Sequence, residues 1–346
     1  MQDVLKYENM KTFDQYKKDN IILSVQALKK FFPVYGGVFG RKKDYVKAVD
    51  GIFFDLIKGK TLGLVGESGC GKSTTGRSII NIYKPDSGDI IYNDFSKNES
   101  VNISKGKNQR KYIAENLQMI FQDPYASLNP RMKVSKIVEE PLIVHKYGNK
   151  NERRDKVIEL FENVGIEKTL IDRYPHEFSG GQRQRVGIAR ALALNPSIII
   201  ADEPVSALDV SVQAQVLNLM KEIQDRLGLT FLFIAHDLSV VQYISHNIAV
   251  MYLGKIVEIS KAHDLYKNPL HPYTKALMSS VPIPDPKARE RYRIRLKGDI
   301  PGPFNIPTGC AFRTRCPYAF KRCEEETPQI RNMSSEHFVA CHLEFS

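Results

Sequence analysis

The sequence has no apolar stretch near the roughly 18 residues that a membrane-spanning helix needs. Its first 20 residues are polar and include acidic side chains, without the apolar segment that a secretory signal carries. Cysteine is scarce over most of the chain, because only Cys70 precedes residue 310 and the other four cysteines follow. We therefore expect a cytoplasmic protein that does not cross a membrane by itself, with one thiol-bearing segment near its C-terminus.

Negative charge is in deficit, with 39 Asp and Glu against 50 Lys and Arg and a formal net charge of +11. This surplus is compatible with a polyanionic partner: a nucleotide, a nucleic acid or an acidic membrane surface. A nucleotide site and membrane proximity would each explain part of it, so the charge is weak support for nucleic-acid binding. The 346 residues suffice for one large domain and a smaller one, and the 42% hydrophobic and 26% charged residues are ordinary for a globular protein.

The order of apolar runs and turn residues predicts an α/β protein. Strands are predicted over 21–34, 46–57, 61–65, 197–201 and 230–235, helices within 131–196 and over 212–226, and a hairpin from 248–252 and 255–259. Two apolar strands joined by a helix are typical of a parallel crossover. Within the helical region, an apolar face at helical spacing is formed by Val157, Leu160, Phe161 and Val164.

Three further segments are not part of this regular pattern. Residues 1–20 are predicted as a flexible or loosely docked extension, and the polar segment 93–116 as a surface excursion. Prolines become frequent after Pro269, which indicates a boundary before a compact tail.

Residues 66–74 (GESGCGKST) lie between the predicted strand 61–65 and a predicted helix that begins near Lys72. They match the pattern G-x-x-x-x-G-K-[ST]. Glycines let successive N–H groups converge on phosphate oxygens, and the helix N-terminus favours an anion. Lys72 can supply a positive charge to the β- and γ-phosphates, and the Ser73 hydroxyl can ligate Mg²⁺. The predicted ATP-binding residues of this phosphate loop are Gly66, Glu67, Ser68, Gly69, Cys70, Gly71, Lys72, Ser73 and Thr74. A redox role for Cys70 is disfavoured.

Two carboxylates follow the apolar run 198–201. A buried strand would deliver Asp202 to its C-terminal edge, where ligands bind in parallel sheets. There Asp202 can hold Mg²⁺ through water, and Glu203 can orient or deprotonate an attacking water molecule. Acidic residues after strands are common, so the pair alone is weak support for a catalytic site. Together with the phosphate loop that precedes it in the chain, the pair is strong support.

A second glycine-rich helix start lies at 178–182 (FSGGQ), where Ser179 is a plausible N-cap. It offers a second anion site in a chain that has a single phosphate loop. A head-to-tail dimer accounts for both sites, because each Ser179–Gln182 segment would then cap the γ-phosphate held by the Lys72 loop of the other chain.

Together these motifs resemble the nucleotide-binding subunits of ABC transporters. In that family's order, Gln122 matches the Q-loop, Ser179–Gln182 the signature sequence, Asp209 the D-loop and His236 the switch histidine. The resemblance implies that Gln122 reaches Mg²⁺ and the attacking water, that His236 bonds the γ-phosphate, and that Asp209 links two active sites. Taken singly, His236 could be a hydrogen-bonded core histidine and Gln122 a loop amide.

The family resemblance also implies a fold and a complete site. The fold is the ABC cassette of P-loop NTPases, with a RecA-like mixed core sheet, an antiparallel β subdomain and an α-helical signature subdomain. The cassette is expected over 21–268, its helical subdomain at about 131–196, and a small irregular cysteine-bearing domain over 269–346. The implied partner-site residues are Ser179, Gly180, Gly181, Gln182 and Asp209. The implied adenine-stacking aromatic is Tyr35 or Tyr45, and both stay open.

The tail resembles that of oligopeptide and dipeptide permease ATPases, most closely their F-type subunit. The resemblance is carried by residues 271–277 (HPYTKAL), 281–286 (VPIPDP), 125–130 (YASLNP) and 173–177 (RYPHE). It implies a peripheral ATPase on the cytoplasmic face of the cell membrane, paired with a D-type ATPase paralogue and two transmembrane permease subunits. An extracellular peptide-binding protein would act indirectly, and nucleic acid is not an expected partner.

The four cysteines of the tail, Cys310, Cys316, Cys323 and Cys341, stand at C-x5-C-x6-C-x17-C. A disulfide is disfavoured in a reducing cytosol and free thiols are an alternative, but so short a segment needs a staple, which favours a metal centre. The spacing does not choose between zinc and iron–sulfur. The resemblance to peptide permeases implies a [4Fe–4S] cluster. Nearby alternative ligands are His271, His337 and His342.

The expected function is ATP hydrolysis that powers import of oligopeptides or dipeptides. Related importers of nickel, glutathione or glycosides share such tails, so the cargo stays open. A soluble ABC ATPase that acts on nucleic acid is a weaker alternative, because the chain has one cassette and no long coiled-coil insertion. A regulatory iron–sulfur module with a vestigial ATPase is disfavoured by the intact catalytic residues.

Overall fold

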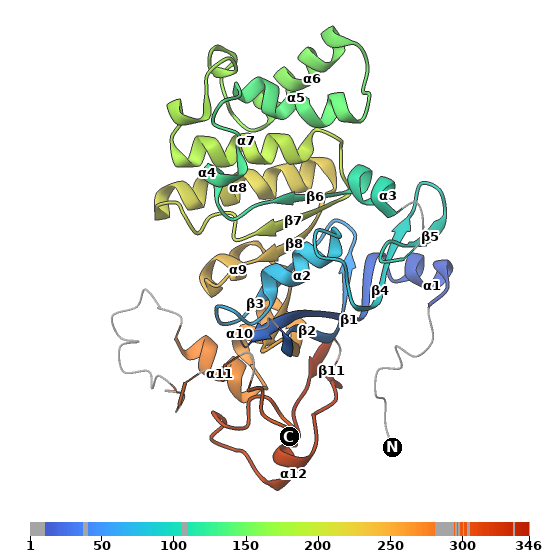
Figure 1. Ribbon diagram of the computed structural model, residues 1–346, viewed down its shortest axis with the longest axis vertical. Helices are drawn as coiled ribbons and strands as arrows, with labels where there is room; N and C mark the ends of the chain where they lie inside the picture. Colours follow the sequence, from blue (N-terminus) through green and yellow to red (C-terminus); the bar gives the residue numbers. More distant parts are fainter. Residues whose placement is uncertain are drawn as a thin grey trace. The chain divides into compact units, whose positions relative to one another are not determined.

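The computed structural model describes residues 11–36, 41–105, 109–280, 305–334 and 336–345, with the single residues 294, 296, 298, 299, 301 and 302 (Figure 1). The chain divides into two compact units. The first contains residues 1–57, 61–105 and 235–346, and the second contains residues 58–60 and 106–234.

An antiparallel sheet of the first unit has the strand order β2-β1-β4-β5. Its strands are β1 (Ile21–Gly36), β2 (Arg41–Ile57), β4 (Ser87–Asp94) and β5 (Glu99–Asn102). Val25 lies opposite Phe54 and Leu23 opposite Leu56, and all four side chains are buried. The predicted strands 21–34 and 46–57 are therefore confirmed, and cross-strand apolar pairs hold them together.

A mixed sheet of the first unit has the strand order β11-β12-β10-β9-β3. Its strands are β3 (Thr61–Val65), β9 (Asn247–Tyr252), β10 (Lys255–Lys261), β11 (Arg331–Ser334) and β12 (His337–Val339). β3 runs parallel to β9, and the remaining pairs are antiparallel. All five residues of β3 are buried, as its continuous apolar run predicts. The predicted hairpin is confirmed as β9–β10.

The helices of the first unit connect and cover these strands. They are α1 (Phe13–Lys18), α2 (Lys72–Ile79), α9 (Leu238–Ile244), α10 (Ala262–Lys267), α11 (Pro272–Ser279) and α12 (Lys321–Glu325).

The second unit has the parallel strand order β8-β7-β6. These strands are β6 (Leu117–Ile120), β7 (Ile198–Asp202) and β8 (Thr230–Ile234). Helix α8 (Val210–Leu227) joins β7 to β8, so the predicted parallel crossover is confirmed. The other helices are α3 (Gln109–Asn116), α4 (Pro124–Ser127), α5 (Val134–Val144), α6 (Lys150–Asn163) and α7 (Gly180–Leu192), with 3₁₀ turns η1 (Lys168–Leu170) and η2 (Pro175–Glu177).

Helices α5, α6 and α7 pack on one another within the helical region predicted for 131–196. The predicted apolar face of Val157, Leu160, Phe161 and Val164 is buried in this packing. Across both units, no helix among the described residues combines the length and the apolar character that crossing a membrane requires.

The surface excursion predicted for 93–116 is wrong in part, because this segment contains β5 and α3. Its polar residues are used inside the sheet: the Asn93 amide donates to the carbonyl of Ile21 at 2.9 Å and accepts from the Ser100 hydroxyl at 2.5 Å. Asn93 is fully buried. A polar composition therefore concealed a strand whose polar groups satisfy one another.

The described part of the N-terminal extension is folded rather than loose. Thr12 and Gln15 form a reciprocal capping box that starts α1. Tyr16 is buried, and its hydroxyl accepts a hydrogen bond from the Gln26 amide at 2.8 Å. The flexible extension predicted for 1–20 thus does not describe residues 13–18, because one aromatic side chain docks the helix on β1; residues 1–10 lie outside the described residues.

The tail contributes strands β11 and β12 to the mixed sheet of the first unit. Glu258 of β10 lies opposite Val339 of β12, and the Ala340 N–H donates to the carbonyl of Val257 at 2.8 Å. The domain boundary predicted at residue 269 stays a prediction, while part of the tail forms the edge of the mixed sheet.

Candidate nucleotide site

The phosphate loop runs from the buried strand β3 to the first residue of α2, as predicted. Gly66 has φ 153° and Gly71 has φ 107°. A Cβ atom at Gly66 would lie 2.1 Å from the Met251 carbonyl oxygen, and one at Gly71 would lie 2.0 Å from that of Ala48. Only glycine fits at these two positions, because the loop lies directly on the backbones of β9 and β2.

Lys72 lies folded back into this loop. Its ammonium donates to the carbonyl oxygens of Gly66 at 2.8 Å and Glu67 at 3.1 Å, and the side chain is buried. Ser73 and Thr74 follow in the first turn of α2 and are half-buried. Gly71, the N-cap, has no side chain to cap the helix, so first-turn N–H groups remain for an anion.

Cys70 is buried within the same loop. Burial raises the pKa of its thiol, and the neighbouring Lys72 charge opposes that rise only in part. A neutral, buried thiol is a poor nucleophile. That a redox role for Cys70 is disfavoured stays a prediction.

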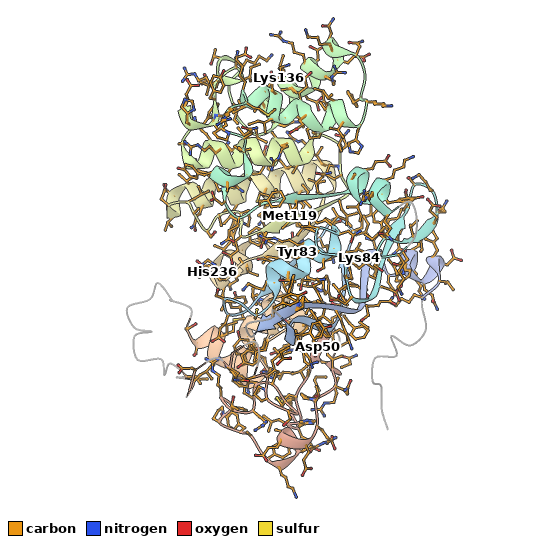
Figure 2. All side chains as sticks on the ribbon, viewed as in Figure 1. Asp50, Tyr83, Lys84, Met119, Lys136 and His236 are labelled. Atoms are coloured by element: carbon orange, nitrogen blue, oxygen red, sulfur yellow. The ribbon has the colours of Figure 1, made fainter. Side chains whose placement is uncertain are left out.

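His236 lies in the first unit, between β8 and α9, and its side chain is exposed (Figure 2). Asp237, the next residue, caps α9 by accepting from the Ser239 N–H at 2.8 Å. The capped helix fixes the backbone at His236. His236 is therefore not a core histidine, which was the alternative left open by its sequence context.

The second unit brings Gln122 and Glu203 together. Nε2 of Gln122 donates to Oε2 of Glu203 at 3.0 Å. Gln122 follows β6 and Glu203 follows β7, and neighbouring parallel strands end at the same edge of a sheet. Asp202, the last residue of β7, is fully buried.

Glu203 has a left-handed backbone conformation with φ 47°. Its N–H donates to the carbonyl of Ile234 at 2.9 Å, and its carbonyl accepts from the Ser206 hydroxyl at 3.1 Å. A non-glycine residue in this region is strained by an amount on the order of 1–3 kcal/mol, and such strain often marks a functional site. Here it turns the chain so that the carboxylate reaches Gln122.

Ser179 is the N-cap of α7, as predicted. Its hydroxyl accepts from the Gln182 N–H at 3.3 Å, and the Gln182 side chain accepts from the Ser179 N–H at 3.0 Å. A Cβ atom at Gly181 would lie 2.3 Å from Cγ1 of Val212 on α8. The glycine at 181 therefore allows α7 and α8 to approach closely, while Ser179 stays exposed and Gly180 half-buried at the helix start.

Asp209 is the N-cap of α8. Its carboxylate accepts from the Ser211 hydroxyl at 2.6 Å and the Val212 N–H at 3.0 Å. These hydrogen bonds, with that of Ser211 the largest, lower the pKa of Asp209. An ionised, exposed carboxylate at this position can meet a partner.

Tyr35 lies near the end of β1 and Tyr45 near the start of β2, and both are exposed. Tyr35 lies opposite Lys42, whereas Tyr45 lies opposite Pro33. The Tyr45 ring lies 6.5 Å from that of Phe31, centroid to centroid. Residues 37–40, which complete the predicted adenine segment, lie outside the described residues.

The four tail thiols are neighbours. Cys310, Cys316 and Cys341 each interact electrostatically with Cys323, and burial raises the pKa of all three, that of Cys310 to about 11. The Cys310 N–H also donates to the carbonyl of Cys323 at 2.8 Å. Within the described ranges, however, no group of three or more His, Cys, Asp or Glu side chains is placed to hold a metal ion.

The three histidines that were alternative metal ligands have other partners. Nδ1 of His271 accepts from the Tyr273 N–H at 3.1 Å, and Nε2 of His337 lies 2.7 Å from Oε1 of the fully buried Glu258. Nε2 of His342 lies 2.9 Å from the carbonyl oxygen of Glu326. The ring of His271 thus caps α11 and that of His337 holds the tail to β10, which argues against a role as ligands.

Two residues that contact the phosphate loop were not predicted. Arg315 forms a two-pronged ion pair with the Glu67 carboxylate, at 2.7 and 3.0 Å, and the Tyr273 hydroxyl accepts from the Glu67 N–H at 2.9 Å. Both come from the tail, more than 200 residues away along the chain. No local pattern in the sequence signals such a pair.

Comparison with known proteins agrees with this geometry. The ABC transporter family model matches residues 49–206, and the model described as the oligopeptide/dipeptide transporter C-terminal region matches residues 257–323. The chain is 56% identical to the oligopeptide transport ATP-binding protein AppF of Bacillus subtilis, over 93% of this chain and 97% of that protein. It is 48% identical to the dipeptide transport ATP-binding protein DppF of Haemophilus influenzae, over 95% and 98%.

Solved structures give the same result. The dimeric, post-hydrolysis ATP-binding cassette MJ0796, bound to ADP and Pi, aligns with a TM-score of 0.59 and 27% identity, over 69% of this chain and 98% of that one. CbiO1 of Clostridium perfringens, part of an ABC transporter complex, aligns with a TM-score of 0.60 and 28% identity, over 72% and 92%. The predicted P-loop cassette fold is confirmed, and the chain belongs to the ABC transporter family, among the ATP-binding subunits of oligopeptide and dipeptide transporters.

Proposed function

We propose that this chain is the ATP-hydrolysing subunit that powers import of oligopeptides or dipeptides across the cytoplasmic membrane. The observation that carries the proposal is the phosphate loop, which lies on the backbones of β2 and β9 and ends at the uncapped start of α2. The names of two relatives, the oligopeptide transport ATP-binding protein AppF and the dipeptide transport ATP-binding protein DppF, support this cargo.

In this proposal the loop N–H groups and Lys72 bind the ATP phosphates. Lys72 would exchange its two carbonyl partners, Gly66 and Glu67, for phosphate oxygens. Mg²⁺ keeps several of its waters and needs only one or two protein ligands besides phosphate. The residues that would hold it are Ser73, Gln122 and, through water, Asp202. When bound, the ion neutralises charge that develops on the phosphates.

Glu203 acts as the general base of the proposed reaction. Its carboxylate takes a proton from the water that attacks the γ-phosphate in line with the leaving oxygen. The hydrogen bond from Gln122 fixes this carboxylate and places an amide beside the water. His236, exposed and held by the capped start of α9, would donate to a γ-phosphate oxygen.

A second ABC ATPase subunit completes the proposed site, as a head-to-tail partner. The Ser179–Gln182 segment is exposed at its first residue and starts a helix, which suits it to cap the γ-phosphate on the partner. Asp209 would then link the two sites. The dimeric state named for MJ0796 supports this arrangement, and the resemblance to peptide permeases favours a D-type paralogue over a second copy.

We further propose that the dimer docks on two transmembrane permease subunits at the cytoplasmic face of the membrane, and that an extracellular binding protein delivers the peptide. The segment after Gln122, around residues 131–142, would transmit closure of the dimer. Importers of nickel, glutathione or glycosides remain the alternative cargo classes.

Tyr45, rather than Tyr35, is the proposed adenine-stacking residue. The β2 backbone touches the phosphate loop at Ala48. Tyr45 lies three residues away, about 10 Å along a strand, whereas Tyr35 pairs with Lys42, about 20 Å away. We expect Tyr45→Ala to raise the KM for ATP severalfold and Tyr35→Ala, its matched control, to leave it unchanged.

The finer assignment of a [4Fe–4S] cluster to Cys310, Cys316, Cys323 and Cys341 is also a proposal. The mutual proximity of the thiols supports it, but their described arrangement does not have ligand geometry, so the thiols would have to converge. Anaerobic purification should then yield about four iron and four sulfide ions per chain. Zinc, or no metal, in place of iron would contradict it.

The proposed function is tested with the whole importer in liposomes. ATP turnover should require the permease subunits and rise when a peptide-loaded binding protein is added, and Lys72→Ala should abolish it. Turnover that responds to DNA or RNA, and not to the permease and its peptide, would point to the soluble nucleic-acid-linked class instead.

A further inference from the structure

The phosphate loop and the cysteine-bearing tail meet at Glu67. Nη1 of Arg315 donates to Oε2 of Glu67 at 2.7 Å, and Nη2 donates to Oε1 at 3.0 Å. We propose that Arg315 is a positioning residue for the phosphate loop, which it holds through Glu67 in the conformation that receives nucleotide phosphates. The inference rests on the proposed assignment of residues 66–74 to ATP, and it gives the tail a part in nucleotide binding.

Glu67 is held from two directions. From the tail, the Arg315 fork binds its carboxylate and the Tyr273 hydroxyl accepts from its N–H at 2.9 Å. From the loop itself, its carbonyl accepts from Lys72 at 3.1 Å and from the Cys70 N–H at 3.3 Å. When Lys72 leaves for a phosphate, the tail contacts and the Cys70 N–H remain, and of these only the tail contacts hold Glu67 from outside the loop.

The surroundings of Arg315 make this contact stiff. The Arg315 side chain is only 8% exposed, and the guanidinium lies 6.0 Å from the centroid of the Tyr252 ring. Tyr252 and Tyr273 pack at 4.7 Å between centroids, and Phe312 lies 5.3 Å from Tyr252 and 5.4 Å from Tyr273. A buried charge pair is screened little by solvent. The aromatic rings packed around the Arg315 guanidinium leave its side chain few alternative rotamers, which favours the two-pronged contact.

Arg315 also changes the electrostatics of the loop, because it neutralises the charge of Glu67. An isolated carboxylate in a loop that binds phosphates would repel them. The guanidinium neutralises Glu67 where it stands, so the positive potential of Lys72 and α2 is not reduced. Lysine cannot replace Arg315 fully, because an ammonium binds as a point charge and does not fix both carboxylate oxygens.

The backbone of Arg315 belongs to the turn that carries two tail thiols. The Arg313 N–H donates to the carbonyl of Cys310 at 3.0 Å, the Arg315 N–H to that of Phe312 at 3.0 Å, and the Cys316 N–H to that of Arg313 at 3.4 Å. Arg315 is thus positioned by a compact turn between Cys310 and Cys316. A change that unfolds this turn withdraws the guanidinium from Glu67, and nucleotide affinity falls with it.

The test measures binding of a fluorescent ATP analogue to the full-length chain. Arg315→Ala should weaken binding on the order of tenfold, because it leaves a charged carboxylate unpaired. Arg315→Lys should show an intermediate loss. In the Glu67→Gln/Arg315→Ala double variant, affinity should recover only in part, since the unpaired charge is gone but the two-pronged contact that positions the loop is still missing. In the assembled ATPase, Arg315→Ala should raise the KM for ATP and leave kcat within about twofold.

Arg322→Ala is the matched control. Arg322 pairs with Glu326 in the same tail at 2.9 Å, but both side chains are more than half exposed. Its removal should leave affinity unchanged. Wild-type affinity in Arg315→Ala, or full recovery of affinity in the double variant, would overturn the inference, because the contact with Glu67 would then not position the loop. Wild-type affinity in Lys72→Ala would instead overturn the proposed ATP site itself.

Discussion

The amide of Gln122 and the carboxylate of Glu203 are joined by a hydrogen bond of 3.0 Å, although 81 residues separate them in the chain. The bond forms because β6 and β7 are parallel neighbours and both residues follow the same edge. It restrains the carboxylate that we propose as the general base.

Replacing Gln122 should therefore affect the rate more than the affinity. Gln122→Ala removes the hydrogen bond that the Gln122 amide donates to the Glu203 carboxylate, and misplacement of a base by about 1 Å can cost up to about a hundredfold in rate. We expect kcat to fall at least tenfold and the KM for ATP to change little. Gln118→Ala is the control, since the Gln118 amide donates to the Ala114 carbonyl at 2.7 Å. Equal kcat values in both variants would contradict the role of Gln122.

Replacing two glycines of α7 by alanine should change the free energy of unfolding in opposite directions. A Cβ atom at Gly181 would lie 2.3 Å from Val212, whereas one at Gly187 would meet nothing within 4 Å. We expect Gly181→Ala to lower the free energy of unfolding by about 1–3 kcal/mol. Gly187→Ala should raise it by about 0.5–1 kcal/mol, because alanine reduces the entropy of the unfolded chain. Denaturant titration of both variants measures these changes. A loss of stability in Gly187→Ala would contradict the prediction that a Cβ atom fits there without a clash.

The buried His271 should make stability depend on pH. Burial lowers its pKa to about 4 from 6.5, so the unfolded chain binds a proton that the folded chain does not. The free energy of unfolding is then unaffected above about pH 6.5 and falls by up to about 1.4 kcal/mol per pH unit between there and about pH 4.

His271→Asn isolates this effect, because asparagine keeps an acceptor for the Tyr273 N–H, which donates to His271 Nδ1 at 3.1 Å. Between about pH 7 and about pH 5, the wild type should lose about 2 kcal/mol more than this variant. Identical losses in denaturant titrations would show that His271 is protonated in the folded chain.

The elements that local chemistry specifies could be predicted from the sequence. Strand β3 is a continuous apolar run that ends at a glycine, and it is fully buried. The N-cap role of Ser179 follows from its own side chain and that of Gln182. The fold class follows from the order of such elements.

The remainder depends on partners far apart in the chain. Asn93 is polar, yet it is buried because the Ile21 carbonyl and the Ser100 hydroxyl satisfy it. Arg315 and Glu67 are 248 residues apart, and neither position carries a local signal of the other. The four tail thiols could be recognised as a group, but their geometry could not be derived from spacing.

The role of Glu203 as the base that activates water is the central claim, and Glu203→Gln tests it most directly. A glutamine keeps the shape of the side chain but cannot accept the proton, and a general base typically contributes about a hundredfold or more to the rate. The variant should bind ATP with wild-type affinity, lose at least about a hundredfold in turnover, and accumulate with its partner subunit as a closed dimer in the presence of ATP. Turnover at the wild-type rate in this variant would contradict the account.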